Sequence, residues 1–90
     1  MKLKPVHPGE VLKEWTAGRS LHEIARSTGL AVSTLSEIQR GRRGITARVA
    51  VRLANYFNTS PRFWMNMQVS YELEIEEDRC AKRTSRKKST

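Results

Sequence analysis

The chain has 90 residues, the length of one small domain, and its 38% hydrophobic and 29% charged residues exclude a wholly disordered chain. No stretch approaches the roughly 20 apolar residues of a membrane span, and no signal-peptide segment is visible, so we expect a cytoplasmic protein without membrane contact. The single cysteine, Cys80, excludes an intramolecular disulfide and a cysteine-rich zinc site. The formal net charge of +8 favours a polyanionic partner, although six of the basic residues lie in residues 79–90.

The first two helices are predicted from their end signals. Pro8 suits the first position of a helix, and Gly18 can supply the left-handed residue that ends it. Ser20 followed by Glu23 is a capping box that starts a second helix. Gly29 then fits a tight turn between two helices, because such a turn needs a positive φ.

A short third helix is predicted over residues 32–39, where Leu35 and Ile38 form the buried pair and the other side chains are small or polar. A basic loop follows, and Thr46 caps a fourth helix that stops near Asn58.

The fifth helix begins at Ser60-Pro61 and carries the most aromatic surface of the chain. Residues 69–76 alternate apolar and polar side chains, which is typical of a strand, but they also form i,i+4 pairs, and a lone strand would have no sheet to join. We therefore favour a helix there. Residues 79–90 have no apolar periodicity and are interpreted as a disordered basic tail, with a nonspecific DNA arm or a contact with the acidic residues 72–78 as alternatives.

The unit from Ser20 to Arg43 points to DNA binding: a capped helix, a glycine turn, a short polar-faced helix and an arginine loop. The outward residues of the third helix are the candidates for contacts with base edges: Val32, Ser33, Ser36 and Glu37. Hydroxyl and guanidinium groups around it are the candidates for phosphate contacts: Ser20, Thr34, Arg40, Arg42, Arg43 and Arg48. The alternative is an ordinary helical bundle with solvated arginines.

Four further segments carry a resemblance to a known family: His7-Pro8-Gly9-Glu10, Leu30 to Thr46, Ala50-x-Arg52-Leu53-Ala54, and Thr59-Ser60-Pro61-x-Phe63-Trp64-x-Asn66-x-Gln68-x-x-Tyr71-x-Leu73. Over roughly residues 5–76 the chain resembles the HigA antitoxins, an Xre-like helix-turn-helix group and addiction module antidotes. The resemblance implies an all-α, five-helix, lambda-repressor-like domain, which we place at residues 1–78 with the flexible tail at 79–90. It also implies a homodimer that represses its own operon and binds a HigB-like, mRNA-cleaving toxin.

The dimer contacts are predicted on the aromatic end of the chain, at Phe63, Trp64, Met67 and Tyr71, although residues of this kind at helical spacing are equally typical of a core. The acidic residues 72–78 are interpreted as a solvated helix end, with a surface for a basic toxin as the alternative.

The sequence allows three classes of function to be compared: an enzyme, a DNA-binding regulator and a protein-binding module. No phosphate-cradling loop, paired histidine ligands or cysteine–histidine pair is present, so we expect neither an enzyme nor a cofactor or metal. We expect a nucleoid-associated antitoxin and repressor that binds an inverted-repeat operator in double-stranded DNA. The rivals are a stand-alone Xre-type repressor without a toxin and a protein-binding module that has lost DNA binding, which the acid Glu37 and the uncapped Ala31 would suit.

Overall fold

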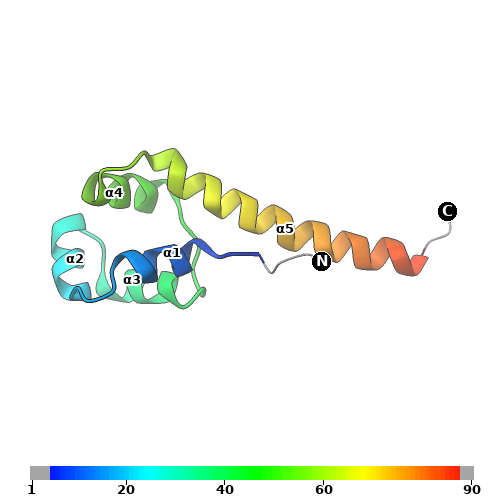
Figure 1. Cartoon of the computed structure of the whole chain (residues 1–90), viewed down its shortest axis with the longest axis horizontal. Coiled ribbons are helices and arrows are strands. Elements are labelled where there is room, and N and C mark those ends of the chain that lie inside the picture. Colours follow the sequence, from blue (N-terminus) through cyan, green and yellow to red (C-terminus); the bar gives the residue numbers. More distant parts are fainter. Residues whose placement is uncertain (1–4, 88–90) are drawn as a thin grey trace.

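The computed structural model describes residues 5–87, with side chains as far as Ala81. This part of the chain folds into five helices and no strand, which confirms the all-α prediction: α1 Pro8–Trp15, α2 Leu21–Thr28, α3 Val32–Gln39, α4 Ala47–Phe57 and α5 Pro61–Lys87. The first four helices form a compact body, and α5 packs along α4 before projecting beyond it (Figure 1). None of the described helices is long and apolar enough to cross a membrane.

Side-chain caps start four of the helices, including α5, where the Ser60 hydroxyl accepts from the Phe63 N–H at 3.2 Å. The Ser20 hydroxyl accepts from the Glu23 N–H at 3.4 Å, and the Thr46 hydroxyl accepts from the Val49 N–H at 3.3 Å, as the sequence predicted. His7 caps α1, since its Nδ1 accepts from the Gly9 N–H at 2.8 Å. Gly29 and Asn58 end α2 and α4 with left-handed backbones, at φ of 79° and 60°, as predicted. Gly18 is also left-handed, but α1 already ends at Trp15 with Thr16 as its C-cap, so the prediction that Gly18 ends this helix is wrong.

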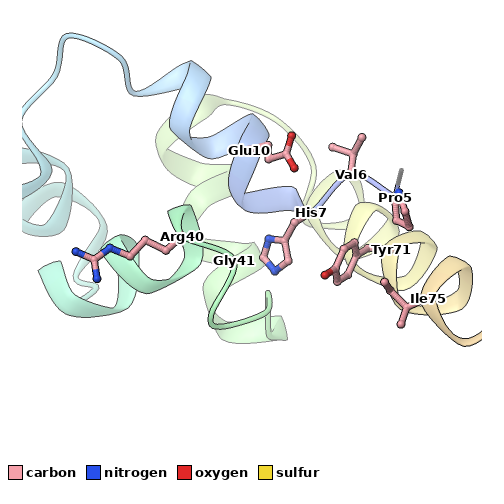
Figure 2. A pocket seen from close by; sticks show the side chains of 8 residues that line it. All are labelled: Pro5, Val6, His7, Glu10, Arg40, Gly41, Tyr71 and Ile75. Atoms are coloured by element: carbon pink, nitrogen blue, oxygen red, sulfur yellow. The ribbon is translucent and has the colours of Figure 1, made fainter. Parts of the chain in front are cut away.

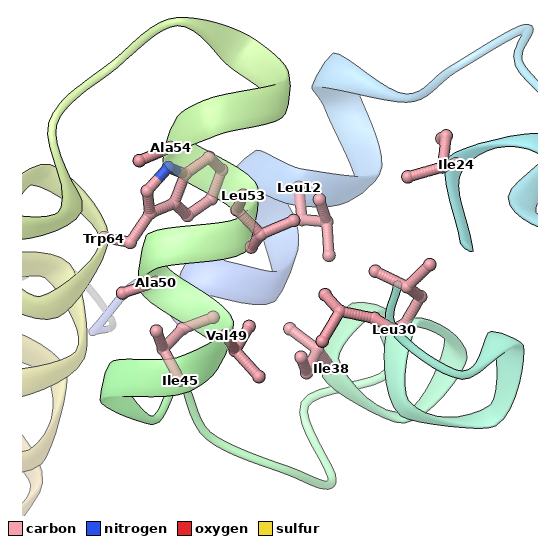
Figure 3. Packing of buried hydrophobic residues seen from close by; sticks show 11 residues of the cluster. Leu12, Ile24, Leu30, Ile38, Ile45, Val49, Ala50, Leu53, Ala54 and Trp64 are labelled. Carbon is pink, nitrogen blue, oxygen red and sulfur yellow. The ribbon is translucent and has the colours of Figure 1, made fainter. Parts of the chain in front are cut away.

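The core lies between α4 and the other helices (Figure 3). Its largest fully buried side chains come from every helix: Leu12, Ile24, Leu35, Ile38, Leu53 and Trp64. Burying each aliphatic side chain contributes roughly 1.5–3 kcal/mol, so these contacts hold the short helices that could not persist alone.

Helix α5 differs from the prediction at its end. Residues 69–76 are helical, which confirms the helix over the strand, but the helix continues to Lys87 where a disordered tail was expected from Arg79. Extending an existing helix needs no new nucleus, lysine and arginine are good helix formers, and basic residues suit a helix C-terminus. Arg79 also pairs with Glu76 one turn earlier, at 3.5 Å. Residues 88–90 of the expected tail lie outside the described residues.

Candidate nucleic-acid interface

The turn between α2 and α3 is fixed by hydrogen bonds on both sides. The Thr28 hydroxyl donates to the Ile24 carbonyl at 2.8 Å and accepts from the Leu30 N–H at 3.2 Å. Arg52 of α4 donates from Nη1 to the Thr28 carbonyl at 3.0 Å. These bonds join the end of α2, the turn at Leu30 and α4, so the turn that leads into α3 is held from both sides. Arg52 is therefore a structural residue.

Helix α3 presents its predicted contact residues on the side away from the core. Leu35 and Ile38 are fully buried, whereas the four candidates for base contacts are exposed or half-buried: Val32, Ser33, Ser36 and Glu37. Thr34, a candidate for a phosphate contact, is half-buried on the same helix. Ala31, at the N-cap, makes no side-chain hydrogen bond, so the first N–H groups of α3 have no side-chain acceptor. Such N–H groups are suited to an anionic oxygen.

Glu37 has a partner that the sequence did not reveal. Its Oε1 accepts from Arg43 Nε at 2.9 Å and lies 2.8 Å from Arg43 Nη2, and both side chains are about half exposed. The Glu37 carbonyl also accepts from the Arg42 N–H at 2.8 Å. The pairing compensates the acid on a surface predicted to face phosphates, and it holds the arginine loop, residues 40–45, against α3. Because the two residues are six positions apart, only the loop conformation brings them together.

The remaining phosphate candidates are exposed: Ser20, Arg40, Arg42 and Arg48. They belong to the start of α2, the arginine loop and the first turn of α4, so they flank α2 and α3 in the sequence. Within the described residues, no three acidic, histidine or cysteine side chains are placed to hold a metal ion.

The four predicted dimer residues lie on the face of α5 that contacts its own domain. Trp64 is fully buried and donates from Nε1 to the Thr59 hydroxyl at 3.0 Å, and Phe63 stacks on Trp15 with 5.3 Å between ring centroids. Met67 packs against the core, and Tyr71 meets the His7 ring edge-on at 4.8 Å. The exposed large apolar residues of α5 are instead Val69 and Leu73, at 46% and 55%. A dimer contact of Phe63, Met67 or Tyr71 stays a prediction. Trp64 is fully buried in the single chain and exposes no surface for a dimer contact.

His7 lies where the N-terminal segment, the end of α3 and α5 meet. A groove opens there, with Arg40 and Gly41 on one side and Tyr71 and Ile75 on the other (Figure 2). Burial lowers the pKa of His7 below its usual value, and the nearby Glu10 carboxylate partly opposes that effect. The ring therefore favours its neutral form, in which Nδ1 can accept the capping hydrogen bond.

Sequence reasoning missed Gln68, a buried amide that joins α5 to the arginine loop. Its Oε1 accepts from the Ile45 N–H at 2.8 Å. The available signal was its position: Gln68 follows Trp64 by four residues and precedes Tyr71 by three, which places a polar residue on the buried face of a helix.

Known proteins share both this sequence pattern and this fold. A family model described as helix-turn-helix matches residues 12–64. Virulence-associated protein I of Dichelobacter nodosus is 39% identical over 79 residues, which cover 84% of this chain and 73% of that protein.

Two solved structures agree over nearly the whole chain. An addiction module antidote protein of the HigA family from Coxiella burnetii has a TM-score of 0.84 at 31% identity, over 98% of this chain and 99% of its own. The Pseudomonas aeruginosa antitoxin HigA, solved with the higBA promoter, has a TM-score of 0.81 at 36% identity, over 92% of this chain and 94% of its own. The resemblance read from the sequence is confirmed. The chain belongs to the helix-turn-helix family, in its Xre-like, HigA-type group.

Proposed function

We propose that this protein is the antitoxin of a type II toxin–antitoxin pair, which represses its own operon and neutralises a HigB-like, mRNA-cleaving toxin by direct binding. The observation that carries the proposal is the α2–α3 unit, whose exposed polar face is flanked by arginines, in a chain 36% identical to an antitoxin solved with promoter DNA. The chemistry supplied by such a surface is binding rather than catalysis.

In this proposal α3 enters the major groove. Val32 lies on a thymine methyl, Ser33 and Ser36 bond to base edges, and Glu37 accepts from a cytosine amino group. Phosphates are held around them by side chains that carry no sequence information: Ser20, Thr34, Arg40, Arg42, Arg43 and Arg48.

The repressor acts as a homodimer on an inverted repeat. Two copies of α3 related by a two-fold axis would enter successive major grooves about 34 Å apart. The exposed pair Val69 and Leu73 supports a dimer contact on α5, because the two residues lie one turn apart and are uncovered in the single chain.

Co-expression tests both activities together. The chain is expressed with the small reading frame beside its gene, and growth, co-purification and repression of a promoter reporter are scored. We expect growth rescue, a stable complex and repression. Rescue without repression would contradict the DNA-binding part, and repression without a toxic neighbour or a complex would leave a stand-alone repressor.

Arg42→Ala with Arg43→Ala separates the two activities. The double variant should lose repression and lower the slope of log affinity against log salt by up to about 2, since each phosphate contact releases a counterion. It should still rescue growth, because toxin binding uses another surface. An unchanged salt slope would remove both arginines from the DNA interface.

A further inference from the structure

Gln68 is the one buried side-chain amide that spans from α5 to the arginine loop among the described residues. It is 7% exposed, and its Oε1 accepts from the Ile45 N–H at 2.8 Å. Its Nε2 donates to Glu72 Oε2, also at 2.8 Å, one turn further along α5. Both ends of the amide are therefore occupied.

Glu72 fixes which way the amide points. A carboxylate only accepts hydrogen bonds, so the NH₂ group must face Glu72 and the carbonyl oxygen must face the Ile45 N–H. With the amide turned over, two acceptors would meet at Glu72 and two donors at Ile45. The Gln68–Glu72 pair thus has one satisfied arrangement.

The arginine loop is shaped to fit this amide. A Cβ on Gly44 would lie 2.9 Å from both Gln68 Nε2 and Oε1, so the loop backbone rests directly against the side chain. The same loop is held to α3 by the ion pair between Arg43 and Glu37 and by the Arg42 N–H, which donates to the Glu37 carbonyl. Arg42 and Arg43 therefore form the anchor to α3, and the anchor to α5 follows directly at Gly44 and Ile45.

We propose that Gln68 is a positioning residue for DNA binding, whose amide sets the place of the arginine loop relative to α3. The inference rests on the proposed function, in which the loop arginines contact phosphates. Gln68 touches no DNA itself: it acts through the Ile45 N–H and the space at Gly44. Since α5 also carries the proposed dimer contact, the same amide connects that helix to the DNA-binding surface.

The test compares three changes at this pair. Gln68→Met keeps the length of the side chain but removes both hydrogen bonds. Gln68→Glu keeps the acceptor for the Ile45 N–H but places two carboxylates side by side. Gln68→Glu with Glu72→Gln exchanges the two groups and restores a donor between them, so this swap should rescue what Gln68→Glu loses.

Two measurements are made on each folded variant: hydrogen exchange of the Ile45 amide and affinity for a promoter DNA duplex as a function of salt. We expect Gln68→Met, which loses the bond to the Ile45 N–H, to show faster Ile45 exchange, about two- to tenfold weaker binding and a salt slope lower by about 1. In Gln68→Glu, repulsion between the two carboxylates should displace the acceptor from the Ile45 N–H and produce changes in the same direction. The swap should return both values close to those of the unchanged chain.

Thr59→Val is the matched control. It removes another hydrogen bond of α5, the 3.0 Å contact from Trp64 Nε1, without touching the loop. Its thermal stability should fall while its salt slope stays unchanged. The positioning role is overturned if Gln68→Met binds like the unchanged chain, matches Thr59→Val in slope, or leaves Ile45 exchange slow. Absence of DNA binding by the unchanged chain would instead be a failure of the proposed function.

Discussion

At the scale of single residues, the proposed DNA contact of α3 implies that the pair of Glu37 and Arg43 limits how strongly this helix attracts DNA. The carboxylate both repels phosphates and occupies a guanidinium that could bind one. Glu37→Gln should therefore raise affinity for random-sequence DNA and steepen its salt slope by up to about 1. Fluorescence anisotropy over a range of KCl concentrations measures both quantities.

Glu76→Gln provides the comparison for this change. Glu76 is also an exposed carboxylate paired with an arginine, Arg79 at 3.5 Å, but it lies on α5 away from α3. The same change of net charge there should leave the slope almost unaltered. Equal behaviour of the two variants would mean that only net charge matters and that Glu37 does not face the DNA.

His7 makes stability depend on pH through its cap. Burial lowers its pKa in the folded chain, so the unfolded chain takes up a proton near pH 6.5 while the folded chain resists it. The contribution of neutral His7 to the free energy of unfolding is fully present above pH 6.5. It is lost as the pH falls through the lower pKa that His7 has in the folded chain. Thermal midpoints between pH 5 and 8 should decline on the acid side of this range.

Asn at position 7 keeps an acceptor for the Gly9 N–H but has no proton to gain in this range. His7→Asn should therefore flatten the acid decline. If this variant and the unchanged chain lose stability in parallel, another group is responsible for the pH dependence.

Contacts local in sequence could be predicted, and contacts that need the folded chain could not. Each of the caps at Ser20 and Thr46 joins two residues three positions apart, so the sequence alone predicts it. The contacts of Glu37 with Arg43 and of Gln68 with the Ile45 N–H span a loop or join two elements, and no spacing rule predicts them. The exposed, polar outer face of α3 was predictable because Leu35 and Ile38 fixed its buried side.

At the scale of elements, the backbone of the turn between α2 and α3 favours glycine, and a contact with Arg52 adds a second, smaller effect. Gly29 has a φ of 79°, and a Cβ there would also lie 2.6 Å from Arg52 Nη1. Gly18 has nearly the same φ, 82°, with nothing within 4 Å of such a Cβ. The two glycines therefore share the backbone strain but differ in the contact.

Gly18→Ala should cost about 1 kcal/mol of unfolding free energy from the left-handed backbone alone. Gly29→Ala should cost more, because Arg52 must also move and weaken its bond to the Thr28 carbonyl. Denaturant unfolding measures both values. An equal loss would show that Arg52 adapts freely and does not hold the turn.

Helix α5 shows where apolar periodicity fails to predict a helix. The helix over residues 69–76 was predictable because the rest of the chain offered no sheet. Its continuation to Lys87 was not, because a charged segment without an apolar face carries no helical period, even when it extends a packed helix.

At the scale of the whole molecule, Val69 and Leu73 leave an apolar strip uncovered on a helix that projects from the domain (Figure 1). The fold explains why the predicted dimer residues turn inward: Trp64 and Tyr71 lie two turns apart on the face toward α1 and α4, whereas Val69 lies on another face. The sequence alone showed that the fifth helix carries the most aromatic surface of the chain. It could not show which face of that helix packs against the domain.

Leu73→Lys tests whether this strip joins two copies. The residue is 55% exposed in the single chain, so the change should spare the core and place two like charges in the dimer contact. Val51→Lys is its control, since Val51 is also an exposed apolar residue, at 47%, but lies on α4. Light scattering should give twice the mass of one chain for the unchanged protein and Val51→Lys, and the mass of one chain for Leu73→Lys.

Operator binding should follow the oligomeric state, because a monomer engages one half-site and loses the gain from linking two. Leu73→Lys should therefore bind a two-half-site duplex more than tenfold more weakly, yet bind a single half-site about as well as the unchanged chain, since its α3 surface is intact. A dimeric Leu73→Lys would exclude the strip and return the interface to the partly exposed residues Phe63, Met67 and Tyr71. A monomer that still binds both half-sites tightly would mean that contacts through DNA, rather than α5, assemble the repressor.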